Sequence, residues 1–137
     1  MTRINLVPVT ELMDQHLIAE YREITMVPAA LKKTINSKQG LQRTNIPKYF
    51  TLNKGHVTFF YNKGAYLFKR YSQLVKEMKT RGFQPNKERI FPKKIFIENG
   101  LFHNWKPSQN DFKIIRKRIE EKIKQRPNWY RKNRIPI

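Results

Sequence analysis

Apolar residues recur at helical spacing in three separate segments of this chain, and this pattern limits the fold more than any other feature of the sequence. The segments are residues 10–36, 63–81 and 108–125. In each of them apolar side chains fall every three or four residues, so they share one face of a helix. Glycine and proline interrupt the two long stretches between the segments, and loops of such length in a compact domain usually carry function. We therefore expect an all-α fold, a single compact domain over residues 1–137 with three main helices and long irregular loops.

Local signals indicate where these helices bend, begin and end. Pro28 predicts a kink or an irregular turn in the first segment, because proline lacks the amide hydrogen that an inner helical turn needs. Arg-Gly at residues 81–82 is a typical helix end, and Ser-Gln-Asn-Asp at residues 108–111 resembles a capping box with Asp in place of Glu. Residues 56–61 could form a short strand, although the sequence contains no second clear strand to pair with it.

The charge of the chain is strongly one-sided. Lysine and arginine number 29 against 10 aspartates and glutamates, which gives a formal net charge of +19. Four of the acids lie within residues 1–23, whereas residues 24–76 contain none against ten lysines and arginines. A solubilising surface normally mixes its signs, so a field this uniform points to a polyanionic partner, with nucleic acid as the first candidate. An aromatic content of 12% separates the chain from disordered basic tails.

Composition also excludes several classes of protein and site. The absence of cysteine excludes a disulfide framework, thiol catalysis and the usual zinc fingers. The acids are scattered and the three histidines lie far apart, so we expect no metal and no cofactor. No apolar run is long enough to span a bilayer and the start lacks a signal-peptide pattern, so we expect an intracellular protein without a membrane partner.

Cleavage of DNA without a metal can begin with an amine that attacks C1′ of the sugar, while a carboxylate stabilises the developing cation. The amine attacks only as the free base. An α-amino group, with an ordinary pKa of about 7.8, supplies roughly a few hundred times more free base at neutral pH than a lysine at about 10.4. Cationic surroundings lower an amine's pKa further. Removal of the initiator Met would expose the amine of Thr2, and the first helix contributes Glu23 as a carboxylate.

Six short motifs follow one another along the chain: Met-Thr-Arg-Ile-Asn-Leu at 1–6, Asp-Gln-His-Leu at 14–17, Ala-Glu-Tyr-Arg-Glu at 19–23, Gly-His-Val-Thr-Phe-Phe-Tyr at 55–61, Glu-Lys-Ile at 121–123 and Gln-Arg-Pro-Asn-Trp-Tyr at 125–130. Together they resemble the phage pyrimidine-dimer DNA glycosylases of the UV endonuclease V type. The resemblance runs in order over nearly the whole chain and is weakest at residues 84–107. Several motifs in register are far more specific than any one of them alone.

The resemblance implies a bifunctional DNA N-glycosylase and abasic-site lyase that acts on UV-induced cyclobutane pyrimidine dimers. In the family the amine of the second residue, here Thr2, forms a Schiff base with C1′ as the base leaves. The glutamate matching Glu23 stabilises the sugar cation and assists β-elimination, and the arginines matching Arg3 and Arg22 hold phosphates around the lesion. The family kinks double-stranded DNA and flips out the base opposite the dimer. We expect the protein to act as a monomer.

Further candidates for DNA contact are Gln15, His16, Lys33, Arg118, Lys122, Trp129 and Tyr130. The two cations of the third helix lie one turn apart, opposite its isoleucines, and either bind phosphates or face solvent. The two aromatic residues either lie near DNA or anchor the tail. His16 either contacts DNA or lies at the edge of the core, and His56, within an apolar run, is expected to be structural.

Two departures from the family pattern affect DNA contacts. The family has a third arginine near the end of the first helix, where this chain has Met26, so Lys32 or Lys33 could supply a phosphate contact. Basic residues replace the family's aromatic tail at positions 131–137, which exchanges stacking for attraction to phosphate. Two alternatives stay open: a DNA-bending protein that has lost the chemistry, and the same mechanism directed at a different base lesion.

Overall fold

Helices supply all the regular structure of residues 3–132, the part of the chain that this computed structural model describes. The all-α prediction is therefore confirmed. The α-helices are α1 (Asp14–Glu23), α2 (Met26–Ile35), α3 (His56–Phe59), α4 (Gly64–Thr80), α5 (Lys94–Glu98) and α6 (Gln109–Gln125). A short 3-10 turn, η1 (Val9–Glu11), precedes α1, and two more lie between later helices, η2 (Arg43–Asn45) and η3 (Phe60–Asn62).

The first predicted helix is two helices. α1 ends at Glu23 and α2 begins at Met26, so the irregular turn predicted from the proline lies at residues 24–25. Pro28 consequently falls in the first turn of α2, where its missing amide hydrogen removes no intrahelical hydrogen bond. The break leaves Glu23 at the end of α1 rather than in the middle of a long helix.

The other two predicted helices, α4 and α6, match their expected ranges to within one residue at each end. The capping box at the start of α6 is present. The Asp111 N–H donates to Ser108 Oγ at 3.1 Å, and the Ser108 N–H donates to Asp111 Oδ2 at 2.9 Å. Ile115 is the fully buried residue on the apolar face of α6, which packs more lightly on the core than α4 does.

The possible strand at residues 56–61 is wrong, because these residues form α3 and η3. A lone strand has no partner for its backbone hydrogen bonds, whereas a helical turn satisfies them internally. Gly55 precedes α3 with a φ of 104°, a conformation that residues with a Cβ rarely adopt. Phe59 and Phe60 thereby enter the hydrophobic core.

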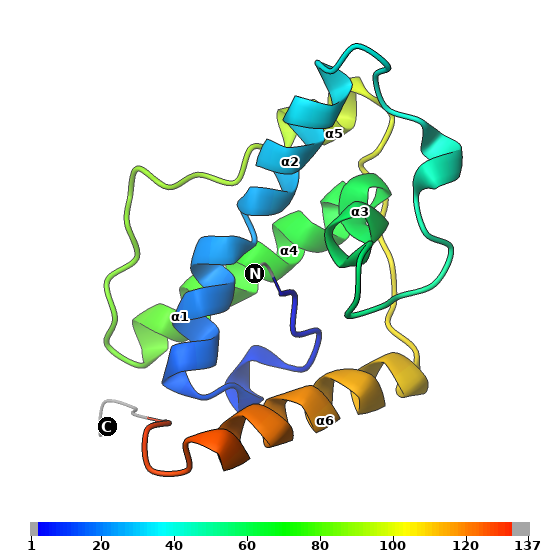
Figure 1. Cartoon of the computed structure of the whole chain (residues 1–137). Coiled ribbons are helices and arrows are strands. Elements are labelled where there is room, and N and C mark those ends of the chain that lie inside the picture. The colour runs from blue at the N-terminus through cyan, green and yellow to red at the C-terminus, as the bar shows by residue number, and fades with distance from the viewer. Residues whose placement is uncertain (1–2, 133–137) are drawn as a thin grey trace.

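Figure 1 shows the arrangement of these elements. α1 packs against α4 near the centre of the molecule, and α6 lies across the lower end. The chain before α1 descends from the middle of the view towards α6, and an ion pair of 2.9 Å joins Glu11 in η1 to Arg116 in α6. No helix in residues 3–132 combines the length and the apolar character that a membrane crossing requires.

Candidate active site at the amino-terminal segment

Residues 3–7, here called the amino-terminal segment, are held by ionisable side chains. Three consecutive backbone N–H groups each donate to a different one. These hydrogen bonds run from Arg3 to Glu23 Oε2 (3.3 Å), from Ile4 to His56 Nε2 (2.9 Å) and from Asn5 to Glu20 Oε1 (3.1 Å). The acceptors come from α1 and α3, so the segment is fixed to two separate elements.

A buried ion pair supports the same segment from α4. Arg70 donates to Glu20 through Nε at 2.6 Å and through Nη2 at 2.9 Å, and Glu20 is 0% exposed. The third guanidinium nitrogen of Arg70 donates to the carbonyl oxygens of Leu6 and Val7. A buried pair is compatible with a stable fold only when its remaining donors and acceptors are satisfied, as they are here.

A tight turn centred on Leu6 follows these bonds. Leu6 has a φ of 58°, and the Val7 N–H donates to the Asn5 carbonyl at 2.5 Å. A hydrogen bond across two residues with a positive φ in the middle is a γ-turn of the rare, strained kind. Such strain persists only where the surrounding contacts hold the backbone in place.

Glu23 is half-buried at the end of α1, and this burial raises the pKa of its carboxyl. The Arg3 N–H and the positive charge of Arg118 act in the opposite direction, because both favour the carboxylate. A carboxyl group under such opposing influences, within electrostatic reach of Arg118, is suited to charge stabilisation and proton transfer.

α6 brings Arg118 into this site. Its charge acts on the pKa values of three residues, Glu23, His16 and His56. Burial is the main cause that lowers the pKa of His16. Lys122, which is exposed one turn further along α6, lowers it further. Both predicted cations of the third helix therefore lie within electrostatic reach of α1.

Gln15, His16, Trp129 and Tyr130 are brought together. Gln15 donates to the Trp129 carbonyl at 2.6 Å and accepts from the Arg131 N–H at 3.0 Å. The rings of His16 and Tyr130 stack with centroids 4.7 Å apart. These contacts fasten the chain after α6 to the start of α1. Trp129 remains 43% exposed beneath the Arg126 guanidinium.

The remaining predicted residues are distributed differently. Arg22 is exposed on α1 next to Glu23, and Lys33 is exposed in the last turn of α2, beyond the break. Thr2 and residues 133–137 of the basic tail lie outside the described part of the chain. Within residues 3–132, no three side chains of the kinds that bind metals cluster together.

The sequence did not indicate the roles of His56 and the Glu20–Arg70 pair in holding the segment. One signal was available: Arg70 falls on the predicted apolar stripe of α4, between Leu67 and Leu74. A charged residue in such a position requires a buried partner. Nothing in the sequence identifies that partner as Glu20, 50 positions away.

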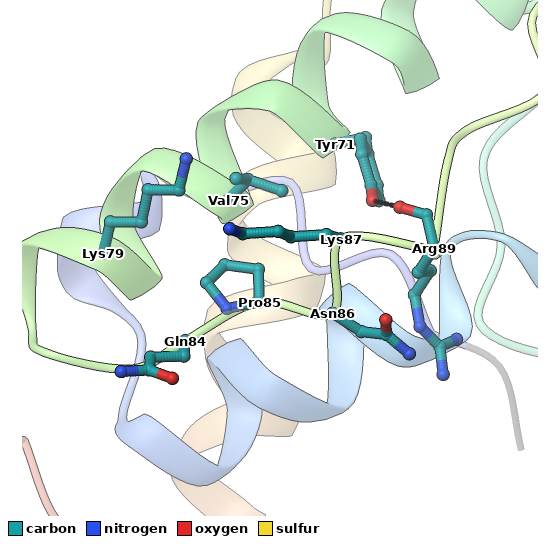
Figure 2. Close-up of a pocket in the computed structure, with 8 residues that line it drawn as sticks. All are labelled: Tyr71, Val75, Lys79, Gln84, Pro85, Asn86, Lys87 and Arg89. Atoms are coloured by element: carbon teal, nitrogen blue, oxygen red, sulfur yellow. Dashed lines mark hydrogen bonds between the residues drawn. The ribbon is translucent and has the colours of Figure 1, made fainter.

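A cavity of about 710 Å³ lies between α4 and residues 84–89 (Figure 2). Its lining contains the cations Lys79, Lys87 and Arg89 and no acid. Arg89 Nη1 also donates to the Arg22 carbonyl at 3.3 Å, which ties this loop to the end of α1. The cavity provides positive charge beside the site but no carboxylate for catalysis.

The sequence model of a family described as pyrimidine dimer DNA glycosylase matches residues 1–91. The matched range contains the amino-terminal segment, its three acceptors and Arg70.

Proposed function

The chain belongs to the pyrimidine dimer DNA glycosylase family, and from this we propose that it is a bifunctional enzyme that excises the lesion and then cleaves the abasic strand. The proposed substrate is double-stranded DNA that carries UV-induced cyclobutane pyrimidine dimers. Both reactions pass through one covalent intermediate with the protein, so a single site serves both.

The proposed nucleophile is the α-amino group of Thr2 after removal of Met1, and the proposed carboxylate is Glu23. One observation carries this pairing: the Arg3 N–H donates to Glu23 Oε2 at 3.3 Å. The backbone nitrogen of Arg3 is only three covalent bonds from the amine of residue 2. An amine so close along the chain is within reach of the same carboxylate.

In the proposed reaction the amine forms a bond to C1′ while the bond from C1′ to the pyrimidine breaks, and the base takes the electron pair. Loss of the amine proton and opening of the C1′–O4′ bond give the Schiff base. Removal of a C2′ proton then expels the 3′ phosphate by β-elimination, and water releases the enzyme from the imine. Glu23 stabilises the sugar cation in the first stage and assists proton removal in the second.

The proposed DNA contacts surround this pair. Arg3 and Arg22 hold the backbone at the lesion, and Arg118 and Lys122 extend the cationic surface along α6. The remaining positive charge attracts undamaged duplex without regard to sequence. Tight binding of the bent backbone presents C1′ to the amine.

Borohydride trapping tests the mechanism directly. Reduction of the Schiff base should join the amino terminus of the protein to dimer-containing or abasic duplex DNA. UV-irradiated plasmid should be nicked in the presence of a chelator. Absence of any adduct at the amino terminus would contradict the proposed nucleophile. Retention of Met1 in the intact mass would block the Thr2 amine and favour a DNA-bending role.

The substitution E23Q tests the carboxylate. Base release should fall by at least about a hundredfold, because a neutral amide cannot stabilise the cation or accept a proton. Affinity for damaged DNA should stay within about threefold of the wild-type value, since the side chain keeps its shape. Single-turnover excision and equilibrium binding on the same duplex measure the two effects, and wild-type excision by E23Q would refute the assignment.

A further inference from the structure

We propose that His56, together with the buried Glu20–Arg70 pair, positions the amino-terminal amine relative to Glu23. We call these three residues the clamp. The inference rests on the proposed function, in which that amine is the nucleophile. The three are positioning residues, because they bind the backbone behind the amine rather than the DNA.

The directions of the hydrogen bonds support this role. In an extended chain, successive N–H groups point to opposite sides. The amides of Arg3 and Asn5 both donate to carboxylates of α1, and the amide between them donates to His56 of α3. Glu20 and Glu23 lie three positions apart and share one face of α1. The segment therefore passes between two elements and is bonded to both.

His56 is held as a rigid acceptor. Its Nδ1 lies 2.8 Å from the Thr51 carbonyl, which can only accept a hydrogen bond, so Nδ1 carries the proton and Nε2 is free to accept from the Ile4 N–H. The ring is 2% exposed and packs edge-on against Phe50 and Phe60. With both nitrogens in use and the ring buried against two phenylalanines, His56 fixes Ile4 in one place.

The Glu20–Arg70 pair fixes the other end of the segment. Glu20 binds the Asn5 amide, and Arg70 binds the carbonyl oxygens that follow the turn at Leu6. A strained turn that is bonded on both sides cannot relax by sliding the chain along α1. The amine of residue 2, three covalent bonds from the Arg3 nitrogen, is then confined to a short distance from this held backbone.

The experiment compares H56F, which keeps an aromatic ring but removes the acceptor, with H56Q, which keeps an acceptor near the Nε2 position. L31A is the matched control, because Leu31 is fully buried in α2, a helix that contains none of the three clamp residues, and its truncation destabilises the fold. Each protein is tested by borohydride trapping on abasic duplex DNA, by equilibrium binding and by amide hydrogen exchange.

In H56F, trapping should slow by about tenfold or more, because a displaced nucleophile loses its alignment with C1′. Binding of abasic DNA should change by less than about twofold, and exchange of the Arg3 and Ile4 amides should accelerate. H56Q should restore trapping to within about threefold of wild type. L31A should lose thermal stability and keep wild-type trapping when it is assayed well below its melting temperature.

Wild-type trapping by H56F would overturn the clamp, as would equal slowing in L31A at a similar loss of melting temperature. Should H56F not fold, H56M removes the acceptor with a flexible side chain and is judged by the same results. Failure of the wild-type protein to form an adduct would instead refute the proposed nucleophile. In that case unchanged exchange at Arg3 in H56F still overturns the clamp, and faster exchange supports it.

Discussion

Glu23 and His56 accept hydrogen bonds from neighbouring backbone amides, yet burial moves their pKa values in opposite directions. Burial raises the pKa of Glu23 and lowers that of His56 to about 4, because it disfavours the charged form of each group. Arg3 and Arg118 lower the pKa of His56 further, and the Thr51 carbonyl and Glu20 oppose them. At neutral pH His56 is therefore an uncharged acceptor, as the Ile4 amide requires.

This pKa predicts a loss of stability in acid. An unfolded histidine protonates near 6.5, whereas folded His56 stays neutral to about pH 4, so the unfolded state binds more protons between these values. The free energy of unfolding should fall as pH drops from about 6.5 to 4, with His56 contributing on the order of 2 kcal/mol. Urea unfolding of wild type and H56Q at pH 7, 5.5 and 4.5 measures this. A slope with pH that is identical in H56Q would assign the loss to other groups.

At the scale of helices, the link between α1 and α4 depends on buried charge. R70L should lower the free energy of unfolding by about 3–5 kcal/mol, because it leaves the fully buried Glu20 carboxylate without its partner. The double variant with E20L should recover part of this loss by removing the unpaired charge. K94A is the control, since its pair with Glu98 is exposed and should contribute nothing measurable. Urea denaturation of all three variants provides the comparison, and equal effects of R70L and K94A would contradict the prediction.

Gln15 contributes two hydrogen bonds to the attachment of the carboxyl-terminal segment to α1, beside the Asp14 N–H, which donates to the Arg131 carbonyl at 2.6 Å, and the His16–Tyr130 stack. Loss of the two Gln15 hydrogen bonds in Q15A should loosen residues 129–131, and trypsin should then cleave after Arg131 several times faster than in wild type. Q125A is a matched control at the exposed end of α6. Cleavage rates followed by mass spectrometry decide the question. Equal acceleration in both variants would indicate general fraying rather than a specific attachment.

The helices differ in how far the sequence predicted them. α4 and α6 were predictable because their apolar stripes are long and their ends carry local signals, Arg-Gly in one and the capping box in the other. The break between α1 and α2 was only partly predictable, since the proline indicates a disturbance but packing decides that it falls at residues 24–25. The hydrogen bond from Ile4 to His56 could not be predicted, because it joins residues 52 positions apart and depends on the tertiary fold.

At the scale of the whole molecule, the few acids are largely engaged within the protein. Among residues 3–132, those in ion pairs are Glu11, Asp14, Glu20, Glu77, Glu98 and Glu120. Most of the 29 lysines and arginines therefore have no carboxylate to neutralise them. The excess positive charge is available for phosphates, and binding of DNA should weaken steeply with salt.

The salt dependence should reveal which cations contact phosphate. K122Q should reduce the slope of log K against log salt by about one, as expected for the loss of a single phosphate contact. K113Q should leave the slope unchanged, because Lys113 lies on the opposite side of α6 from Lys122. Binding titrations from low to moderate salt on one undamaged duplex measure both. Equal slopes for the two variants would remove Lys122 from the DNA-binding surface.

Because the clamp binds backbone amides, the proposal makes the position of the terminal amine depend on the number of residues that precede the bonded amides in the mature chain. One extra residue before Arg3 cannot be absorbed by sliding, so it would carry the terminal amine about 3.5 Å beyond its proper place. Proline at position 4 or 5 would remove an amide hydrogen that donates to the clamp. In the proposed mechanism the reactive group is thus specified less by a side chain than by a count of peptide bonds, and removal of Met1 becomes a step that activity requires.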